Sequence, residues 1–271
     1  MIKKDGASVT ISDLQEEQGM KTVEAMRATY GKDRVHFVVC DVTKDEQLEA
    51  MFKASEDFFK GPVDILVNNA GINTNLGWKL CMKVNIMAMM SATQMAMDRM
   101  KNRQDCKIVN IASLAGIGPG IGEGSMGYTV SKHGAVTLSR TLAANKHEHG
   151  IDILCLCPSW ANTDIVNKVD SEKKPMVDKM VKEMGGLMKP ERVGEAFKAL
   201  MSSKNGTVLT VMANVPLIEL PDLGFTRVMC TGAAGQLISK FFNVKILDTW
   251  HFMAAILVFT IIIQVMLRII F

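Results

Sequence analysis

The 271-residue chain has little charge imbalance, few aromatic residues and no paired-cysteine motif. Its formal net charge is only +3 and no stretch is strongly basic, so we expect no nucleic-acid surface. None of the six cysteines forms a Cys-x-x-Cys motif, and most lie in apolar stretches. This pattern indicates buried, reduced thiols and argues against a disulfide framework. No metal site is predicted either.

Short β-branched runs alternate with longer helical patterns, which is typical of βαβ units and a parallel sheet. Strands are expected at about 8–12, 35–39, 63–67, 107–111, 151–156 and 207–212, and helices at about 14–30, 43–59, 78–101 and 190–201. Thr43 and Glu46 have the spacing of a capping box at the start of the second helix. The sequence therefore predicts an α/β fold with a Rossmann-like, doubly wound parallel sheet.

One of only two tyrosines stands four residues before a lysine, as Tyr128 and Lys132. On a helix, side chains at i and i+4 lie on one face, a turn apart. An ammonium group beside a phenol favours the phenolate, which can take a proton from an alcohol. Taken alone, the pair is equally well explained as two solvated side chains.

Further polar and small residues follow the ends of predicted strands, where ligands bind in open parallel sheets. They are Asp13, Asp41 and Val42, the run Asn68-Asn69-Ala70-Gly71, Ser113, and the segment from Pro158 to Thr163. Small residues let the backbone approach a ligand closely. Asn85 lies inside the long helix, where asparagine is a poor helix former and needs a reason. These positions predict one ligand site at the carboxyl edge of the sheet.

Together these motifs resemble the short-chain dehydrogenase/reductase family over about residues 6–216. The resemblance implies that Tyr128 is the general base of an alcohol oxidation and that Lys132 supports the phenolate. It also implies that Ser113 holds the reacting oxygen and that Asn85 anchors a water molecule in the proton relay. Both residues also have a purely structural explanation. Ser113 is then a hydroxyl at the end of a strand, and Asn85 is a helix amide whose hydrogen bonds are made locally.

The same resemblance implies that NAD is the cofactor and assigns it a set of contacts: Asp13, Asp41, Val42, Asn68, Ala70, Gly71, Tyr128, Lys132 and Thr163. An acid at the position of Asp13 binds the adenosine ribose and repels the phosphate of NADP. An aspartate in the first turn of a helix is also stabilised by the helix dipole, so both explanations stay open. The implied substrate is a small-molecule secondary alcohol on a hydroxylated lipid, or the matching ketone; a steroid or retinoid is the alternative.

Members of the family begin with a strand, a glycine-rich turn and a helix, roughly 25 residues in length. These elements are not found before Gly6, so we expect an N-terminally truncated sheet. The missing strand belongs between the strands at 8–12 and 63–67, which leaves two unpartnered edges and predicts weak NAD binding. The alternative function is a catalytically inactive, membrane-tethered scaffold.

The longest apolar run is the C-terminal stretch 252–271, interrupted only by Thr260, Gln264 and Arg268. Twenty helical residues span about 30 Å, the thickness of a bilayer core. We therefore expect a dehydrogenase domain over 1–215 facing the cytosol, a connecting segment over 216–250 and a transmembrane helix over 251–271. The alternative is a cytoplasmic protein with a buried or dimer-packing C-terminal helix. A homodimer is expected in either case.

Overall fold

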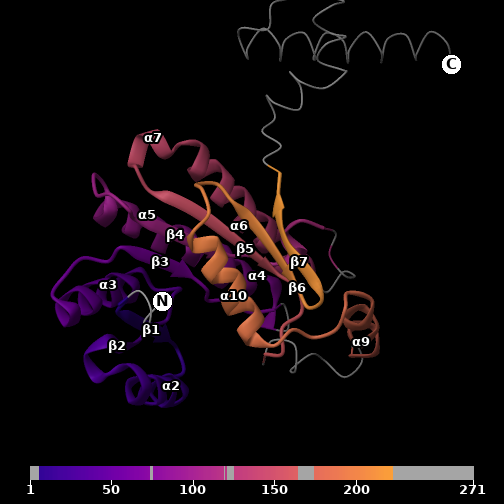
Figure 1. Cartoon of the computed structure of the whole chain (residues 1–271), viewed down its shortest axis with the longest axis horizontal. Helices are drawn as coiled ribbons and strands as arrows, with labels where there is room; N and C mark the ends of the chain where they lie inside the picture. Colours follow the sequence, from indigo (N-terminus) through magenta and orange to yellow (C-terminus); the bar gives the residue numbers. More distant parts are fainter. Residues whose placement is uncertain (1–5, 74–75, 119, 121–124, 164–173, 222–271) are drawn as a thin grey trace, which may run out of the picture. The chain divides into compact units, whose positions relative to one another are not determined.

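The computed structural model describes residues 6–73, 76–118, 120, 125–163 and 174–221 (Figure 1). The chain divides into two compact units, 1–220 and 221–271, and every element below belongs to the first. The predicted transmembrane helix at 251–271 lies outside the described residues. Within the described part of the chain, no helix is long and apolar enough to cross a membrane.

The strands form two separate sheets (Figure 1). The smaller sheet pairs β1 (Val9–Asp13) with β2 (Val35–Val39) in parallel. The larger sheet has the order β3-β4-β5-β6-β7 and is parallel except for its last, antiparallel pair. Its strands are β3 (Ile65–Asn68), β4 (Lys107–Ile111), β5 (Asp152–Pro158), β6 (Val208–Met212) and β7 (Val215–Leu220).

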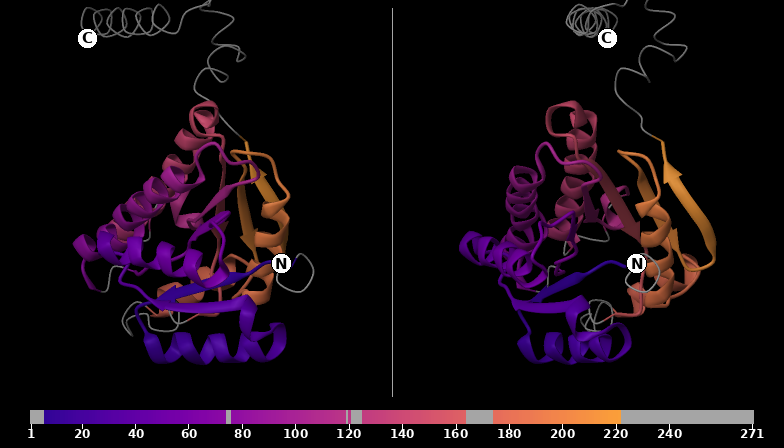
Figure 2. Two further views of the ribbon diagram at one scale, coloured as in Figure 1. Left: turned by 90° about the vertical axis from the view of Figure 1, so that its left-hand side faces the viewer. Right: turned by 60° about the vertical axis from the view of Figure 1, so that its left-hand side comes forward.

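Helices cover both faces of the larger sheet, with α5 and α6 on one side and α10 on the other (Figure 2). The helices are α2 (Glu16–Tyr30), α3 (Asp45–Phe59), α4 (Trp78–Met82), α5 (Ala88–Met100), α6 (Met126–Ala144), α7 (Lys146–His149), α9 (Lys174–Glu183) and α10 (Pro190–Met201). A π-helical turn, Lys83–Met87, joins α4 to α5. This layered arrangement confirms the predicted α/β fold with its largely parallel sheet.

Strand β5 shows why the larger sheet holds together. Cys155 and Cys157 pack towards α6, whereas Leu154 and Leu156 pack towards α10, and all four side chains are fully buried. A strand covered on both faces has apolar residues at successive positions instead of alternating ones. The five described cysteines are all buried and free, as the sequence predicted.

The outer edges of β1 and β3 have no strand partner among the described residues. Val67, in the middle of β3, is 40% exposed, and no residue of β1 is fully buried. These are the two edges for which the sequence predicted a missing neighbour. Helix α3 connects the two sheets, because its Leu48 and Phe52 share an apolar cluster with Leu66 of β3.

Three local predictions need correction. Helix α3 begins at Asp45, and Thr43 donates its hydroxyl hydrogen to Asp41 Oδ1 (2.8 Å) instead of forming a capping box. The long predicted helix at 78–101 is interrupted by the π-helical turn. Strand β7 was not predicted and falls largely in the segment assigned to a connection. Pro216 obscured β7, but proline is tolerated there because β7 is an edge strand.

Candidate active site

Tyr128 and Lys132 lie one turn apart near the start of α6, on one face of the helix. The Lys132 side chain is 5% exposed, and its Nζ lies 5.7 Å from the centroid of the Tyr128 ring. Gly116 permits this arrangement, since a Cβ atom at that position would lie 2.5 Å from the Lys132 carbonyl oxygen. The turn after β4 therefore packs directly on the helix that carries the pair.

Burial acts on both members of the pair. It lowers the pKa of Lys132 to about 8, although the nearby thiols of Cys155, Cys81 and Cys157 oppose part of that fall. Burial also raises the pKa of Tyr128, and a hydrogen bond with Ser113 opposes part of that rise. Near neutral pH the ammonium of Lys132 is still largely protonated and can stabilise a phenolate. Lys132 Nζ donates to the Ile111 carbonyl (2.9 Å), which fixes it against the end of β4.

Ser113 stands where the ends of β4 and β5 meet. Its Oγ accepts a hydrogen bond from the Ala115 amide (3.2 Å) and donates to the Pro158 carbonyl (3.4 Å). The first bond caps the short 3-10 turn Leu114–Gly116. The Ser113 hydroxyl also lowers the pKa of Tyr128, so two of the predicted catalytic side chains interact.

Asn85 is fully buried in the π-helical turn. Its Oδ1 accepts from the Ile72 amide (2.8 Å), and its Nδ2 donates to the Ile72 carbonyl (2.9 Å) and to Ser131 Oγ (3.0 Å). The Asn85 side chain thus has the local hydrogen-bond partners expected if its role is structural. Its place in a proton relay stays a prediction. A Cβ atom on Gly71 would lie 3.4 Å from Asn85 Oδ1 and 3.5 Å from Lys132 Nζ, so this turn reaches the catalytic helix.

Asp13 and Asp41 lie at the carboxyl ends of β1 and β2. These ends adjoin, because the Cys40 amide donates to the Asp13 carbonyl (3.0 Å). Asp13 is exposed, and its Oδ1 accepts a hydrogen bond from the Gln15 amide (2.8 Å). The hydroxyl and amide of Thr43 both donate to Asp41 Oδ1, and these bonds lower the pKa of Asp41. Both carboxylates are therefore held at the edge where an adenosine group is predicted.

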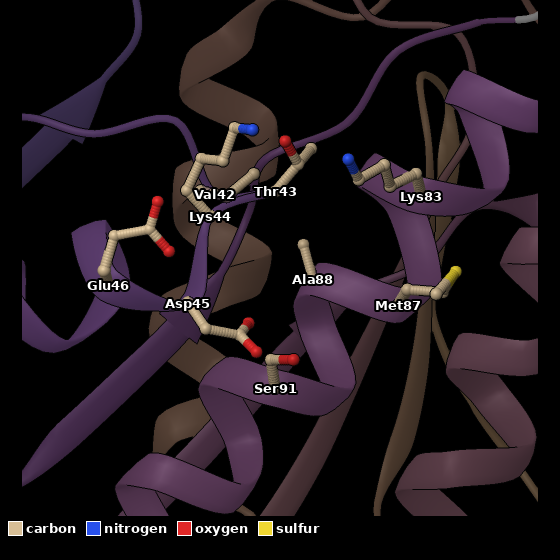
Figure 3. A pocket seen from close by; sticks show the side chains of 9 residues that line it. All are labelled: Val42, Thr43, Lys44, Asp45, Glu46, Lys83, Met87, Ala88 and Ser91. Carbon is tan, nitrogen blue, oxygen red and sulfur yellow. The ribbon is translucent and has the colours of Figure 1, made fainter.

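A hollow of about 350 Å³ opens beside Asp41, between the start of α3 and the π-helical turn (Figure 3). It is lined by Val42, Thr43, Lys44, Asp45, Glu46, Lys83, Met87, Ala88 and Ser91. Figure 3 shows Asp45 and Ser91 together at one end, away from Lys83 and Thr43. None of the predicted catalytic side chains lines it, so this hollow is not where the alcohol would react. It places the predicted adenine neighbour Val42 next to the turn that holds Asn85.

The remaining predicted cofactor residues have different surroundings. Asn68 is buried, and its Nδ2 donates to Thr93 Oγ1 (3.0 Å) and Asn110 Oδ1 (2.8 Å), which ties β3 to α5 and β4. Ala70 is exposed. Thr163 is also exposed, and its hydroxyl donates to the Ala161 carbonyl (3.3 Å). The predicted residues thus fall into a catalytic group on the larger sheet and an adenosine group on the smaller one.

Sequence reasoning missed the buried polar residues that connect these groups to the core. Asn110 lies in the middle of β4, and Ser131 and Ser139 lie on the buried face of α6. The signal was available, since a polar residue inside an otherwise apolar strand or helix face needs a hydrogen-bond partner. Their side-chain partners could not be identified, because they lie between 29 and 46 residues away along the chain.

Comparisons with known proteins show what this chain is similar to. The family model described as short chain dehydrogenase matches residues 1–174. Human 15-hydroxyprostaglandin dehydrogenase [NAD(+)] is 30% identical over 221 residues, which cover 76% of this chain and 82% of that protein. An uncharacterized oxidoreductase of Thermotoga maritima is 31% identical over 204 residues, covering 72% and 78% of the two chains.

Two solved structures share the fold. Levodione reductase superposes with a TM-score of 0.68 at 23% identity, covering 76% of this chain and 86% of that one. A polyketide ketoreductase solved with NADPH gives a TM-score of 0.65 at 24% identity, covering 78% and 88%. At these identities the likeness concerns the fold alone. It matches the Rossmann-like architecture predicted from the order of the elements.

Proposed function

Because the chain belongs to the short-chain dehydrogenase family, we propose that it oxidises a secondary alcohol, with NAD as the hydride acceptor and Tyr128 as the general base. One observation carries the proposal. Ser113 lowers the pKa of Tyr128, which lies one helical turn from the buried Lys132, and Ser131 bonds with both Asn85 and the Tyr128 backbone carbonyl. Four side chains from three segments therefore meet at the carboxyl end of the larger sheet.

The proposed roles follow from the chemistry of each group. Tyr128 takes the hydroxyl proton of the alcohol, and the Lys132 ammonium lowers the cost of the phenolate. The Ser113 hydroxyl holds the reacting oxygen at hydrogen-bonding distance from the phenol. When bound, NAD supplies the acceptor for the hydride that leaves the alcohol carbon. Burial of Lys132 and Asn85 keeps water away from the proton path.

The residues at the nicotinamide end suit such a cofactor. Lys132 has three N–H donors, and its bond to Ile111 uses one of them, so donors remain for ribose hydroxyls. Gly71 lies close to Lys132 and leaves the space that a side chain would fill. At the other end, Asp41, Val42 and the exposed Asp13 would contact the adenosine.

The preference for NAD over NADP rests on Asp13. Its carboxylate lies at the carboxyl end of β1 and would repel the additional phosphate of NADP. The human relative is named as an NAD(+) enzyme, which supports this choice, whereas one structural neighbour was solved with NADPH. A hydroxylated lipid resembling a 15-hydroxyprostaglandin is the proposed substrate, on the strength of that relative's name.

A second copy of the chain is the proposed partner. Met87 and Met90 of the π-helical turn and α5, and Met126 and Val130 of α6, are each more than half exposed. Exposed apolar side chains of this size mark protein–protein contacts when they gather in a patch. Attachment to a membrane through residues 251–271 is proposed from the sequence pattern alone.

The test is NAD-dependent oxidation of prostaglandin E2 by the purified full chain, followed by NADH absorbance. Tyr128→Phe should reduce kcat by roughly 10²- to 10⁴-fold, because proton transfer by a positioned base contributes that much. Tyr30→Phe is the matched control, since Tyr30 is the only other tyrosine and lies at the end of α2. Equal activity of the two variants would overturn the role of Tyr128.

A catalytically inactive scaffold is the second candidate. The observation in its favour is the break between the two sheets, which separates the adenosine group from the catalytic group. Titration of the full chain with NADH, followed by cofactor fluorescence, separates the two functions. Tight binding excludes the scaffold, whereas no binding at millimolar NADH excludes the dehydrogenase.

A further inference from the structure

Ser131 is buried on α6 and connects the catalytic turn to Asn85. Its hydroxyl accepts a hydrogen bond from Asn85 Nδ2 (3.0 Å) and donates to the Tyr128 carbonyl (2.7 Å), three residues earlier in the helix. The residue has no exposed surface. A serine that bonds back to its own helix in this way fixes the local backbone.

A second serine on the same helix has the same chemistry at another place. Ser139 is 2% exposed, accepts from Asn110 Nδ2 (2.9 Å) and donates to the Ala135 carbonyl (2.7 Å). The two serines therefore share burial, donor type and back-bonding. They differ in the residue whose carbonyl accepts the hydrogen bond, because only Ser131 donates to Tyr128, the proposed base.

Asn85 cannot easily replace Ser131 with another partner. Its Nδ2 has two hydrogens but lies near three acceptors: the Ile72 carbonyl (2.9 Å), Ser131 Oγ (3.0 Å) and Cys81 Sγ (3.2 Å). The carbonyl and the hydroxyl are the stronger acceptors, and sulfur is a weak one. Loss of the Ser131 hydroxyl would leave a buried N–H with the thiol alone, and such a group moves until it finds a partner.

The hydrogen bond from Ser131 to the Tyr128 carbonyl is important because of where Tyr128 lies in the helix. Helix α6 begins at Met126, so Tyr128 lies in its first turn, where the amide groups lack the intrahelical partners of later turns. Beyond the backbone, the turn is held by Gly116 packing against Lys132 and by the Ser131 hydroxyl. A shift of this turn would move the phenol away from Ser113.

We propose that Ser131 is a positioning residue for the alcohol oxidation: held by Asn85, its hydroxyl fixes the first turn of α6 so that the Tyr128 phenol stays beside Ser113. This inference rests on the proposed role of Tyr128 as the base. It assigns the Asn85 side chain a task, which is to anchor Ser131 through its amide.

The decisive measurement needs no turnover. The full chain, labelled with ¹³C at the tyrosine ring carbon that bears the oxygen, should give two signals, and Tyr30→Phe identifies that of Tyr128. In Ser131→Ala the Tyr128 pKa should rise by about one unit, a tenfold change in its ionisation constant, because the phenol moves away from the Ser113 hydroxyl, which lowers this pKa. Ser139→Ala should leave this pKa unchanged.

Kinetics with prostaglandin E2 and NAD give a second readout. Ser131→Ala should lower kcat by about tenfold, in line with the loss of one buried hydrogen bond. The KM for NAD should change by less than about twofold, because Ser131 is not placed against the cofactor. If Ser131→Ala does not fold, Ser131→Cys, which keeps the volume and weakens the acceptor, should shift the pKa in the same direction by less.

Two results overturn the inference: an unchanged Tyr128 pKa in both Ser131 variants, or an equal shift in Ser139→Ala. Either result would mean that Ser131 and Ser139 both contribute to stability in the same way. The proposed function fails by another route, namely a wild-type chain that neither binds NADH nor oxidises the alcohol. The titration still decides the role of Ser131 in that case.

Discussion

The two sheets are built from similar residues but differ in burial. In β5 of the larger sheet the side chains from Ile153 to Cys157 are completely buried, whereas Val39 of β2 in the smaller sheet is 44% exposed. The apolar content of a strand therefore does not determine how well it is covered. Its neighbours do: β5 lies between two strands and two helical layers, whereas β1 pairs with one strand among the described residues.

The two parts of the predicted site differ in burial in the same way as the two sheets. In its catalytic group, which lies on elements of the five-stranded sheet, Lys132 is 5% exposed and Asn85 is fully buried, whereas Tyr128 and Ser113 are partly exposed. Its adenosine group is carried by the two-stranded sheet, where Asp13 is exposed. Two-stranded sheets are marginally stable in isolation, and helix α3 supplies the apolar contacts of this one with the core. The predicted catalytic and adenosine groups thus lie on parts of the fold that differ in burial.

The largest expected contrast is in amide hydrogen exchange. Exchange from β5 should require global unfolding, whereas β1 should exchange through local opening of the small sheet. We expect protection factors in β1 to be lower by about 10³ or more, a difference of roughly 4 kcal/mol in opening free energy. Exchange followed by mass spectrometry on the full chain measures this. Comparable protection in β1 and β5 would show that the two sheets open together.

The next contrast concerns the pH dependence of activity, which we expect to follow the buried Lys132. With a pKa of about 8, Lys132 is protonated below that pH and loses its charge as the pH rises through it. Its support of the Tyr128 phenolate is therefore present below pH 8 and lost above it, so kcat/KM should fall on the alkaline side. Lys132→Arg keeps the charge and should move this alkaline limb upward by more than one pH unit. A limb at the same pH in both proteins would assign it to another group.

The smallest expected effect belongs to the exposed half. Asp13→Ala should reduce the preference for NAD over NADP by about tenfold, because the repulsion of the NADP phosphate is lost in a solvent-screened position. The ratio of kcat/KM values for the two cofactors measures the change. Asp33→Ala, a change of the same type in the short 3-10 turn before β2, is the control and should leave the ratio unaltered. If the selectivity of Asp13→Ala is unchanged, the only role left for this carboxylate is to accept the hydrogen bond from the Gln15 amide and cap the turn.

Most of the fold was predictable because it depends on local patterns. The bounds of α10 and β2 agree with prediction to the residue, since Pro190 marks a helix start and a β-branched run marks a strand. The capping box at Thr43 failed because Asp41, two residues away, offered the hydroxyl a charged acceptor. Strand β7 was missed because Pro216 interrupts the strand pattern of its sequence.

The sequence by itself determined the spacing of Tyr128 and Lys132 and the small residues of the turn at Ala70 and Gly71. Helical and strand periods are properties of neighbouring residues, so they can be read without a structure. Only the tertiary structure decided that the Asn85 amide is bound to Ile72 and Ser131, and that burial brings the pKa of Lys132 down to about 8. Hydrogen-bond partners and desolvation come from segments far apart in the chain, and folding alone brings those together.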